Sequence, residues 1–290
     1  MGRPWHLALD AAGNVYVADL AEHQVFAFTP AGVLLTSWNC PAMPPLDFEP
    51  QGIAVTTTGH VFVAAGGAPS WPGLLSFTTG GEYLGPVGTY GPGPCEMYRP
   101  FGVAVDDQGH LYVADASKSC VEVITSAGGC VTQWGEWGEG PGQFHFPLAI
   151  AVSATGLVYV CDDDNQRIQV FTTDGVFVRQ WGGLGSAPGQ FAGPWGVALD
   201  AGGNVYVADA ANNRIQVFTG SGEFITQWGT AGSGPGQFNR PRGVVVAPDG
   251  TVYVSDTWNC RIQVFGPVPT PTNSTSWGRV KTLYRGRRSP

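Results

Sequence analysis

The chain has 290 residues, a formal net charge of −8, 43 glycines and 23 prolines. Residues 1–278 hold nine basic and 22 acidic side chains, a net charge of −13, and this acidic balance disfavours nucleic acid as a partner because it repels phosphate backbones. No run of about 18 apolar residues is present, which excludes a membrane-spanning helix.

The chain is built from a unit that recurs six times, and each unit opens with a proline. The opening prolines lie 46 to 50 residues apart, at Pro4, Pro50, Pro100, Pro147, Pro194 and Pro241. Nine residues after each proline stands a glycine, where the turn after the first strand is expected to need a positive φ. An aspartate ends the predicted second strand in five units and a tryptophan ends the fourth in four, whereas the second unit departs with Ala65 and Val87.

Each unit contains four short runs rich in Val, Ile, Phe and Tyr, separated by Gly, Asn and Asp, as in an antiparallel meander. Unit five, 194–229, shows this most clearly, and its second run, 205–208, is apolar on both alternating faces, as in a sheet covered on both sides. A four-strand repeat of about 40–50 residues is typical of a propeller blade. We therefore predict an all-β, six-bladed β-propeller with four antiparallel strands per blade over residues 1–278, followed by a basic tail, 279–290.

The repeated pattern resembles the NHL repeat over residues 3–265, most closely in units four to six. The motifs that carry the resemblance are Pro-x-Gly-Val-Ala-Leu-Asp, Gly-Asn-Val-Tyr-Val-Ala-Asp, Asn-Arg-Ile-Gln-Val-Phe, Trp-Gly and Gly-Pro-Gly-Gln-Phe. The resemblance implies a six-bladed propeller. The family includes interaction domains of animal ubiquitin ligases, some of which bind RNA, extracellular sensor domains of bacterial kinases, and a zinc-dependent lyase acting on peptidyl-hydroxyglycine. Membership therefore leaves the activity open.

Ligands of propellers usually meet the mouth of the central channel, where the first strands converge. The residues that flank the opening prolines are therefore the predicted ligand-binding set. They are Trp5, His6, Arg99, Phe101, Trp195, Arg240 and Arg242. Aromatic platforms and arginine donors suit a neutral or anionic ligand, such as a glycan or a peptide carboxylate. The competing interpretation is that these side chains only pack blade against blade.

The second unit has three extra residues between Ala65 and Phe77, in a loop that contains Trp71. The repeat places this loop on the same face as the channel mouth. Because the regular unit already satisfies the fold, a departure from it can mark a binding surface, and we predict Trp71 as part of an interaction loop. The alternative is sequence drift in a blade under weak demand.

The sequence predicts no catalytic residue and no metal ligand. The lyase of the family holds zinc with histidines that project into the channel from different blades, and only His6 is near such a position here. The acidic segment 162–164 could bind calcium weakly, with a solvated loop as the alternative. Calcium or zinc in the channel is therefore unsupported, and no cofactor is expected. The aspartates that recur at one position are expected to cap backbone amides.

The six cysteines match no zinc-binding spacing. A disulfide between Cys40 and Cys95, or between Cys95 and Cys120, is conceivable, with unpaired cysteines as the alternative. The composition fits an exported bacterial protein, periplasmic or extracellular. The first unit begins at Pro4, which leaves no room for a leader and indicates a mature form or a fragment.

Ring closure is predicted from the end of the repeat. The segment 274–277 stands where the fourth strand of unit six belongs, so we expect it to pair with 261–265 and to let the ring close by packing between units one and six. The alternative is that an absent amino-terminal strand fills this place. The tail 279–290 carries five basic residues and could bind an acidic surface or act as an export or attachment signal; the alternative is a solvated tail.

These observations favour a monomeric, non-enzymatic scaffold that binds a protein, peptide or glycan partner at the channel mouth. The alternative is a metal-dependent lyase or hydrolase with its site in the central channel.

Overall fold

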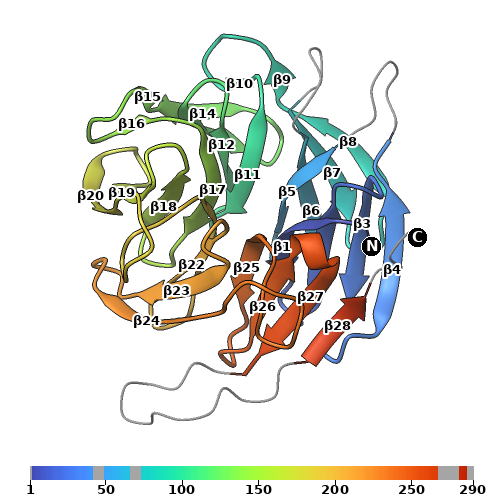
Figure 1. Cartoon of the computed structure of the whole chain (residues 1–290). Coiled ribbons are helices and arrows are strands. Elements are labelled where there is room, and N and C mark those ends of the chain that lie inside the picture. Colours follow the sequence, from blue (N-terminus) through green and yellow to red (C-terminus); the bar gives the residue numbers. More distant parts are fainter. Residues whose placement is uncertain (1, 42–48, 66–72, 267–280, 286–290) are drawn as a thin grey trace.

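The computed structural model describes residues 2–41, 49–65, 73–266 and 281–285, which form six four-stranded sheets arranged around one axis (Figure 1). Each sheet is a meander in which strands that follow one another in the chain pair antiparallel. The first strand of each sheet lies innermost, as the labels β1, β5, β11, β17 and β25 in Figure 1 show. The predicted all-β, six-bladed propeller is confirmed.

The strands follow the repeat in every blade. Blades one and two contain β1 (Pro4–Leu9), β2 (Val15–Asp19), β3 (Gln24–Phe28), β4 (Leu34–Asn39), β5 (Pro50–Val55), β6 (His60–Ala65), β7 (Leu74–Thr78) and β8 (Tyr83–Val87). Blades three and four contain β11 (Pro100–Val105), β12 (His110–Asp115), β13 (Cys120–Thr125), β14 (Cys130–Trp134), β17 (Pro147–Val152), β18 (Leu157–Asp162), β19 (Arg167–Thr172) and β20 (Phe177–Gly182). Blades five and six contain β21 (Pro194–Leu199), β22 (Val205–Asp209), β23 (Arg214–Phe218), β24 (Phe224–Trp228), β25 (Pro241–Val246), β26 (Val252–Asp256), β27 (Arg261–Phe265) and β28 (Lys281–Arg285).

The remaining elements are short. Two linkers between blades contain parallel pairs, β9 (Thr89–Tyr90) with β10 (Glu96–Met97) and β15 (Glu136–Trp137) with β16 (Gln143–Phe144). A 3-10 turn, η1 (Thr257–Asn259), follows β26. In the described part of the chain no helix has the length and apolarity needed to cross a bilayer.

Glycine two residues after the opening proline brings the blades together at the axis. A Cβ atom on Gly52 would lie 2.1 Å from the carbonyl oxygen of Phe101 in the next blade, and one on Gly196 would lie 2.0 Å from that of Arg242. A side chain on either glycine would push two first strands apart. The four first strands that carry glycine here therefore pack backbone against backbone on a neighbouring first strand, which sets the residues before and after this position around the channel mouth.

The aspartate that ends the second strand anchors the preceding linker, as predicted from its recurrence. In blade five, Asp209 accepts hydrogen bonds from the amide of Ala192 at 2.8 Å and from Nε of Arg214 at 2.7 Å. The guanidinium of Arg214 also donates to linker carbonyl oxygens, including those of Ala187 and Gln190. Blades four and six repeat this arrangement with Arg167 and Arg261. The linkers on the mouth face are therefore fixed by buried, charge-assisted bonds.

The tryptophan that ends the fourth strand fills the space between neighbouring blades. The Trp134 ring lies 4.5 Å from the Phe171 ring of the next blade, and a Cβ atom on Gly175 would lie 2.3 Å from Trp134. Trp38, Trp181 and Trp228 hold equivalent positions. These outer wedges and the close inner strands together give the ring its core.

The prediction for the last strand was wrong in its residues. The segment 274–277 lies outside the described residues, and the strand that pairs with β27 is β28. Ile262 pairs with Tyr284, as Ile215 pairs with Trp228 in blade five. A tyrosine therefore occupies the register position at which the repeat spacing predicted a tryptophan. Five of the twelve residues of the predicted basic tail, 279–290, therefore belong to blade six.

Ring closure by packing is confirmed. Blade six takes all four strands from the carboxyl-terminal part of the chain, and it lies beside blade one (Figure 1). The hydroxyl of Ser255 donates to the carbonyl oxygen of Trp5, and that of Thr257 donates to the carbonyl oxygen of Pro4, both at 2.8 Å. An apolar cluster that includes Leu7, Val17 and Tyr253 spans the same junction.

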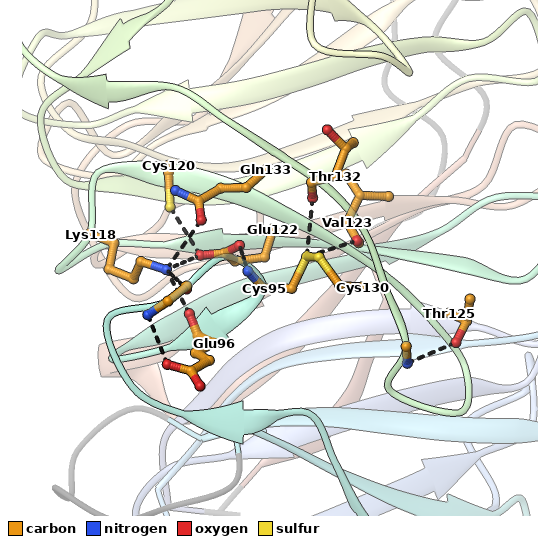
Figure 2. Close-up of a disulfide and its surroundings, with 12 residues drawn as sticks. Cys95, Glu96, Lys118, Cys120, Glu122, Val123, Thr125, Cys130, Thr132 and Gln133 are labelled. Atoms are coloured by element: carbon orange, nitrogen blue, oxygen red, sulfur yellow. Dashed lines mark hydrogen bonds and ion pairs between the residues drawn. A yellow bond between two sulfur atoms is a disulfide. The ribbon is translucent and has the colours of Figure 1, made fainter.

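The predicted disulfide partners of Cys95 were also wrong. Cys95 is bonded to Cys130 at the start of β14, with a Cα–Cα distance of 5.4 Å, while Cys40 and Cys120 are buried thiols (Figure 2). As in blades four to six, where a linker glycine donates to the glutamine at the corresponding position, the amide of Cys95 donates to the Glu122 carboxylate at 2.8 Å. The disulfide thus fastens this linker to its own blade.

Blade three lacks the anchoring arginine of blades four to six and uses a lysine instead (Figure 2). Cys120 stands at the position of Arg167, and Lys118 Nζ donates to the carbonyl oxygens of Gly93 and Glu96 at 2.8 and 2.7 Å. These two carbonyls correspond in the repeat to those that accept from Arg167 in blade four. Lys118 also pairs with the buried carboxylate of Glu122 at 2.5 Å. A lysine two residues earlier therefore takes over the bonds of the missing arginine.

Candidate binding site at the channel mouth

Side chains that follow the opening prolines converge at one end of the channel. Trp5, Phe101 and Leu148 form one buried cluster, and Trp195 packs against it. The Trp5 and Trp195 ring centroids lie 5.5 Å apart, and those of Phe101 and Trp195 lie 6.1 Å apart, both in edge-to-face contact. The structure therefore brings the three predicted aromatic residues together, although they come from blades one, three and five.

The Arg242 side chain enters this cluster from β25. Its guanidinium carbon lies 3.3 Å from the centroid of the Trp5 ring and 3.8 Å from that of Trp195, which is cation–π contact with both rings. Arg242 is 7% exposed, and its Nε and Nη1 atoms have no hydrogen-bond partner among the described residues. The side chain of the predicted Arg242 thus packs against two aromatic rings, while its Nε and Nη1 have no acceptor among the described residues.

Three further buried polar atoms of this region lack a partner within the described ranges: Trp5 Nε1, Gln51 Oε1 and Asp163 Oδ1. Gln51 follows Pro50, so it holds the position in blade two that Trp5 holds in blade one. Asp163 directly follows β18, and a Cβ atom on Gly193 would lie within 3.6 Å of both its Oδ1 and the Trp195 ring. The mouth therefore carries open donors and open acceptors.

Our predicted set did not include Gln51 or Asp163. Both are exceptions at their repeat positions. Gln51 is a neutral polar residue where most units have an aromatic or aliphatic side chain, and Asp163 stands where the other units carry Leu20, Ala116, Ala210 and Thr257. Comparing the six units at each repeat position would have identified both residues, because each is polar where most other units carry an apolar side chain.

Burial and neighbouring charges shape the electrostatics of the mouth. Burial lowers the pKa of Arg242 to about 9, and the positive charges of Arg240 and Arg3 act in the same direction, whereas Asp163 opposes them. Burial also raises the pKa of Asp163 to about 7, with Asp164 and Asp162 adding to the effect and Arg242 opposing it. Near neutral pH this carboxyl is partly protonated, so the arginines leave the mouth positive within an acidic chain.

His6 lies in the channel beneath the aromatic cluster, at the position where other units carry glycine or alanine. Burial lowers its pKa to about 4, while a hydrogen bond with the Trp195 backbone opposes the shift. The ring is therefore neutral at neutral pH. Below it, aliphatic residues of all six first strands line a cavity of about 290 Å³. His6 thus lies between the mouth and this cavity.

The outer rim of the mouth adds arginine and aromatic side chains. Arg99 lies 5.5 Å from the Phe101 ring centroid and 5.3 Å from that of Phe146, and Arg240 is exposed. On the same face Trp258 is 48% exposed beneath the Arg3 guanidinium, and Trp137 of β15 is 69% exposed. Neither tryptophan belongs to the predicted set, because both lie away from the opening prolines. Trp71 lies outside the described residues.

The acidic segment 162–164 does not act as one cluster. Asp162 pairs with Arg167 at 2.7 Å inside the blade, Asp163 faces the mouth, and Asp164 pairs with His145 at 3.2 Å. Over the described ranges, no three His, Cys, Asp or Glu side chains are grouped so that they could hold a metal ion.

The model of the NHL repeat family matches residues 97–124, 144–171, 191–218 and 238–265, which cover the first three strands of blades three to six. No curated protein sequence matches the chain.

Solved structures share the fold at low identity. A streptogramin B lyase has a TM-score of 0.67 and 14% identity, with 99% of this chain and 84% of that one covered. Virginiamycin B lyase from Staphylococcus aureus has a TM-score of 0.65 and 15% identity, with 99% and 86% covered. A chain of the nidogen/laminin complex has a TM-score of 0.61 and 14% identity, with 84% and 86% covered. Four consecutive repeats match the family model and six blades surround one channel; the chain belongs to the NHL-repeat family of β-propellers.

Proposed function

We propose that this chain is a non-enzymatic binding scaffold whose channel-mouth face binds a protein, peptide or glycan partner. The observation that carries the proposal is that five of the ten buried polar atoms without a described partner belong to mouth residues, namely Trp5, Gln51, Asp163 and Arg242. Buried polar groups in folded proteins are generally hydrogen-bonded, so open ones that face the mouth are suited to a ligand. The exposed rings of Trp137 and Trp258 extend this face outward.

The fold itself accommodates both binding and catalysis. A similar propeller occurs in the nidogen/laminin complex and another in streptogramin B lyase. The choice therefore rests on side chains. Arginines held by aromatic rings supply recognition, and the neutral His6 is a weak base because its pKa is about 4. These features favour binding over chemistry.

We also propose an exported location, periplasmic or extracellular. The disulfide between Cys95 and Cys130 supports it, because disulfides persist in oxidising compartments. Peptide mapping of the protein isolated from culture medium or periplasm, without reductant, is expected to recover the linked pair. Recovery of the protein only from the cytoplasmic fraction, with both cysteines as thiols, would contradict this location.

Arrays of peptides and glycans test the scaffold proposal. Wild type is compared with Trp195→Ala at the mouth and Trp137→Ser at the rim, and Val176→Ser serves as control because Val176 is 63% exposed on a hairpin of the opposite face. We expect bound partners to be lost in both tryptophan variants and kept in the control, with or without a chelator. Turnover of an array component, or binding abolished by the chelator, would instead favour the metal-dependent lyase or hydrolase.

A further inference from the structure

The buried arginines of this chain differ in one respect. Arg167, Arg214 and Arg261 are as buried as Arg242, and each of their side-chain nitrogens donates to a carboxylate, a side-chain amide or a linker carbonyl. Arg242 has Nε and Nη1 without any partner in the described part of the chain. A buried guanidinium with open donors is costly to the folded state unless a ligand completes it. Three satisfied arginines show that the fold can complete such groups.

The charges that face Arg242 leave it without a counter-ion. Arg240 and Arg3 are the cationic neighbours, His6 is neutral, and Asp163 is the acidic neighbour. Asp163 makes no ion pair with Arg242 within the described residues, and its Oδ1 is itself without a partner. An anion is therefore attracted to the guanidinium by three arginines and resisted by one carboxyl group.

The polar atoms without a hydrogen-bond partner also indicate which chemical group lies next to the anion. Arg242 and Trp5 offer N–H donors, whereas Gln51 Oε1 and Asp163 Oδ1 need donors from the ligand. A sulfate or phosphate ion satisfies the first group and leaves the second unpaired. A carboxylate with a hydroxyl or amide N–H on the neighbouring atom satisfies both.

We propose that the channel mouth is a subsite for a carboxylate group flanked by a hydrogen-bond donor, with Arg242 as the anion-binding residue and Asp163 and Gln51 as acceptors for the donor. This inference rests on the proposed function, because it names the chemical group that the binding face recognises.

Isothermal titration calorimetry at low salt tests the subsite with small probes. Glucuronate carries hydroxyl donors beside its carboxylate and N-acetylglycine carries an amide donor, so the pair separates the two sources of this chemistry. Glucose and N-acetylglycinamide are the uncharged controls, and sulfate is the tetrahedral control. We expect saturable binding of at least one carboxylate, and weaker or no binding of its uncharged partner and of sulfate.

Variants assign the binding to the mouth. Arg242→Gln is expected to weaken the carboxylate by about tenfold or more, as for the loss of a charge-assisted hydrogen bond. Arg179→Gln removes the same charge from β20, where the Arg179 guanidinium donates to the Gly220 carbonyl on the face opposite the mouth, and is expected to change affinity by less than about threefold. Asp163→Asn removes the opposing charge, keeps an acceptor oxygen, and is expected to strengthen binding several-fold at pH 8.

The proposal is overturned if neither carboxylate binds, if sulfate binds as tightly, or if Arg242→Gln binds like wild type. Circular dichroism first establishes that Arg242→Gln is folded. If it is not, the Asp163→Asn comparison decides, because unchanged or weaker binding there contradicts an anion at Arg242. Loss of array partners in Trp195→Ala, with no carboxylate binding by wild type, would reject this subsite and leave the scaffold proposal standing.

Discussion

Asp163 carries a carboxyl group that burial holds partly protonated near neutral pH, beside a guanidinium with which it makes no ion pair. Its folded-state pKa of about 7 lies above the ordinary value of 3.8, so the folded protein binds a proton that the unfolded chain releases between these pH values. The carboxyl therefore costs stability above pH 7, and this cost disappears as the pH falls toward 4.

Asp163→Asn is accordingly expected to be more stable than wild type above pH 7, by about 2–4 kcal/mol at one pKa unit per 1.4 kcal/mol. The difference is expected to shrink to near zero around pH 4. Urea unfolding of both proteins from pH 4 to 8 measures this difference in the free energy of unfolding. His6, whose pKa is lowered to about 4, makes stability change with pH in the opposite direction, but both proteins contain it and its effect cancels. Asp107→Asn removes an exposed carboxylate and controls for net charge. A difference independent of pH would contradict the assigned burial.

At the scale of one element, the linker into blade three shows what the repeat could and could not predict. The strands, turn glycines and capping aspartates followed from the recurrence, because each position meets the same environment in every blade. The side chains that anchor the linker did not follow, because Lys118, Cys120 and Glu122 replace the Asn, Arg and Gln of blade four together. Spacing alone cannot show that one cation has moved two residues along the chain to bind the same carbonyls.

Lys118→Met is expected to destabilise the protein by about 3–5 kcal/mol, because it leaves the buried Glu122 carboxylate without its cation. The triple variant Lys118→Asn, Cys120→Arg and Glu122→Gln copies blade four and is expected to recover most of that stability. Denaturant unfolding of both variants provides the comparison. A triple variant no more stable than Lys118→Met would show that the two anchors are not equivalent.

At the scale of the whole molecule, the ring depends on a strand that the sequence placed incorrectly. The repeat spacing predicted a tryptophan in the last strand, but the strand register places a tyrosine at the matching position of β28. The connection from β27 to β28 is longer than the corresponding connections in the other blades. The mouth was placed correctly because first strands must converge on the axis of any propeller. Its open atoms were not foreseen, because whether a buried nitrogen has a partner depends on distances that no repeat pattern contains.

Removal of residues 281–290 is expected to lower the midpoint of thermal unfolding by about 5–10 °C, since it strips the outer strand from blade six and 1 kcal/mol corresponds to about 2–4 °C in a domain of this size. Removal of residues 286–290 alone keeps β28 and is the control. Calorimetry measures both. Equal midpoints for the two truncated proteins would contradict the assignment of β28 to the ring.

Ligand entry at the channel mouth can be followed by the indole N–H signals of a nitrogen-labelled protein. Glucuronate or N-acetylglycine is titrated while each tryptophan is assigned by substitution. We expect the signals of Trp5 and Trp195, whose rings contact Arg242, to move with saturation, while those of Trp134 and Trp181, wedged between blades, do not. Saturable movement of the wedge signals with the mouth signals unchanged would contradict it.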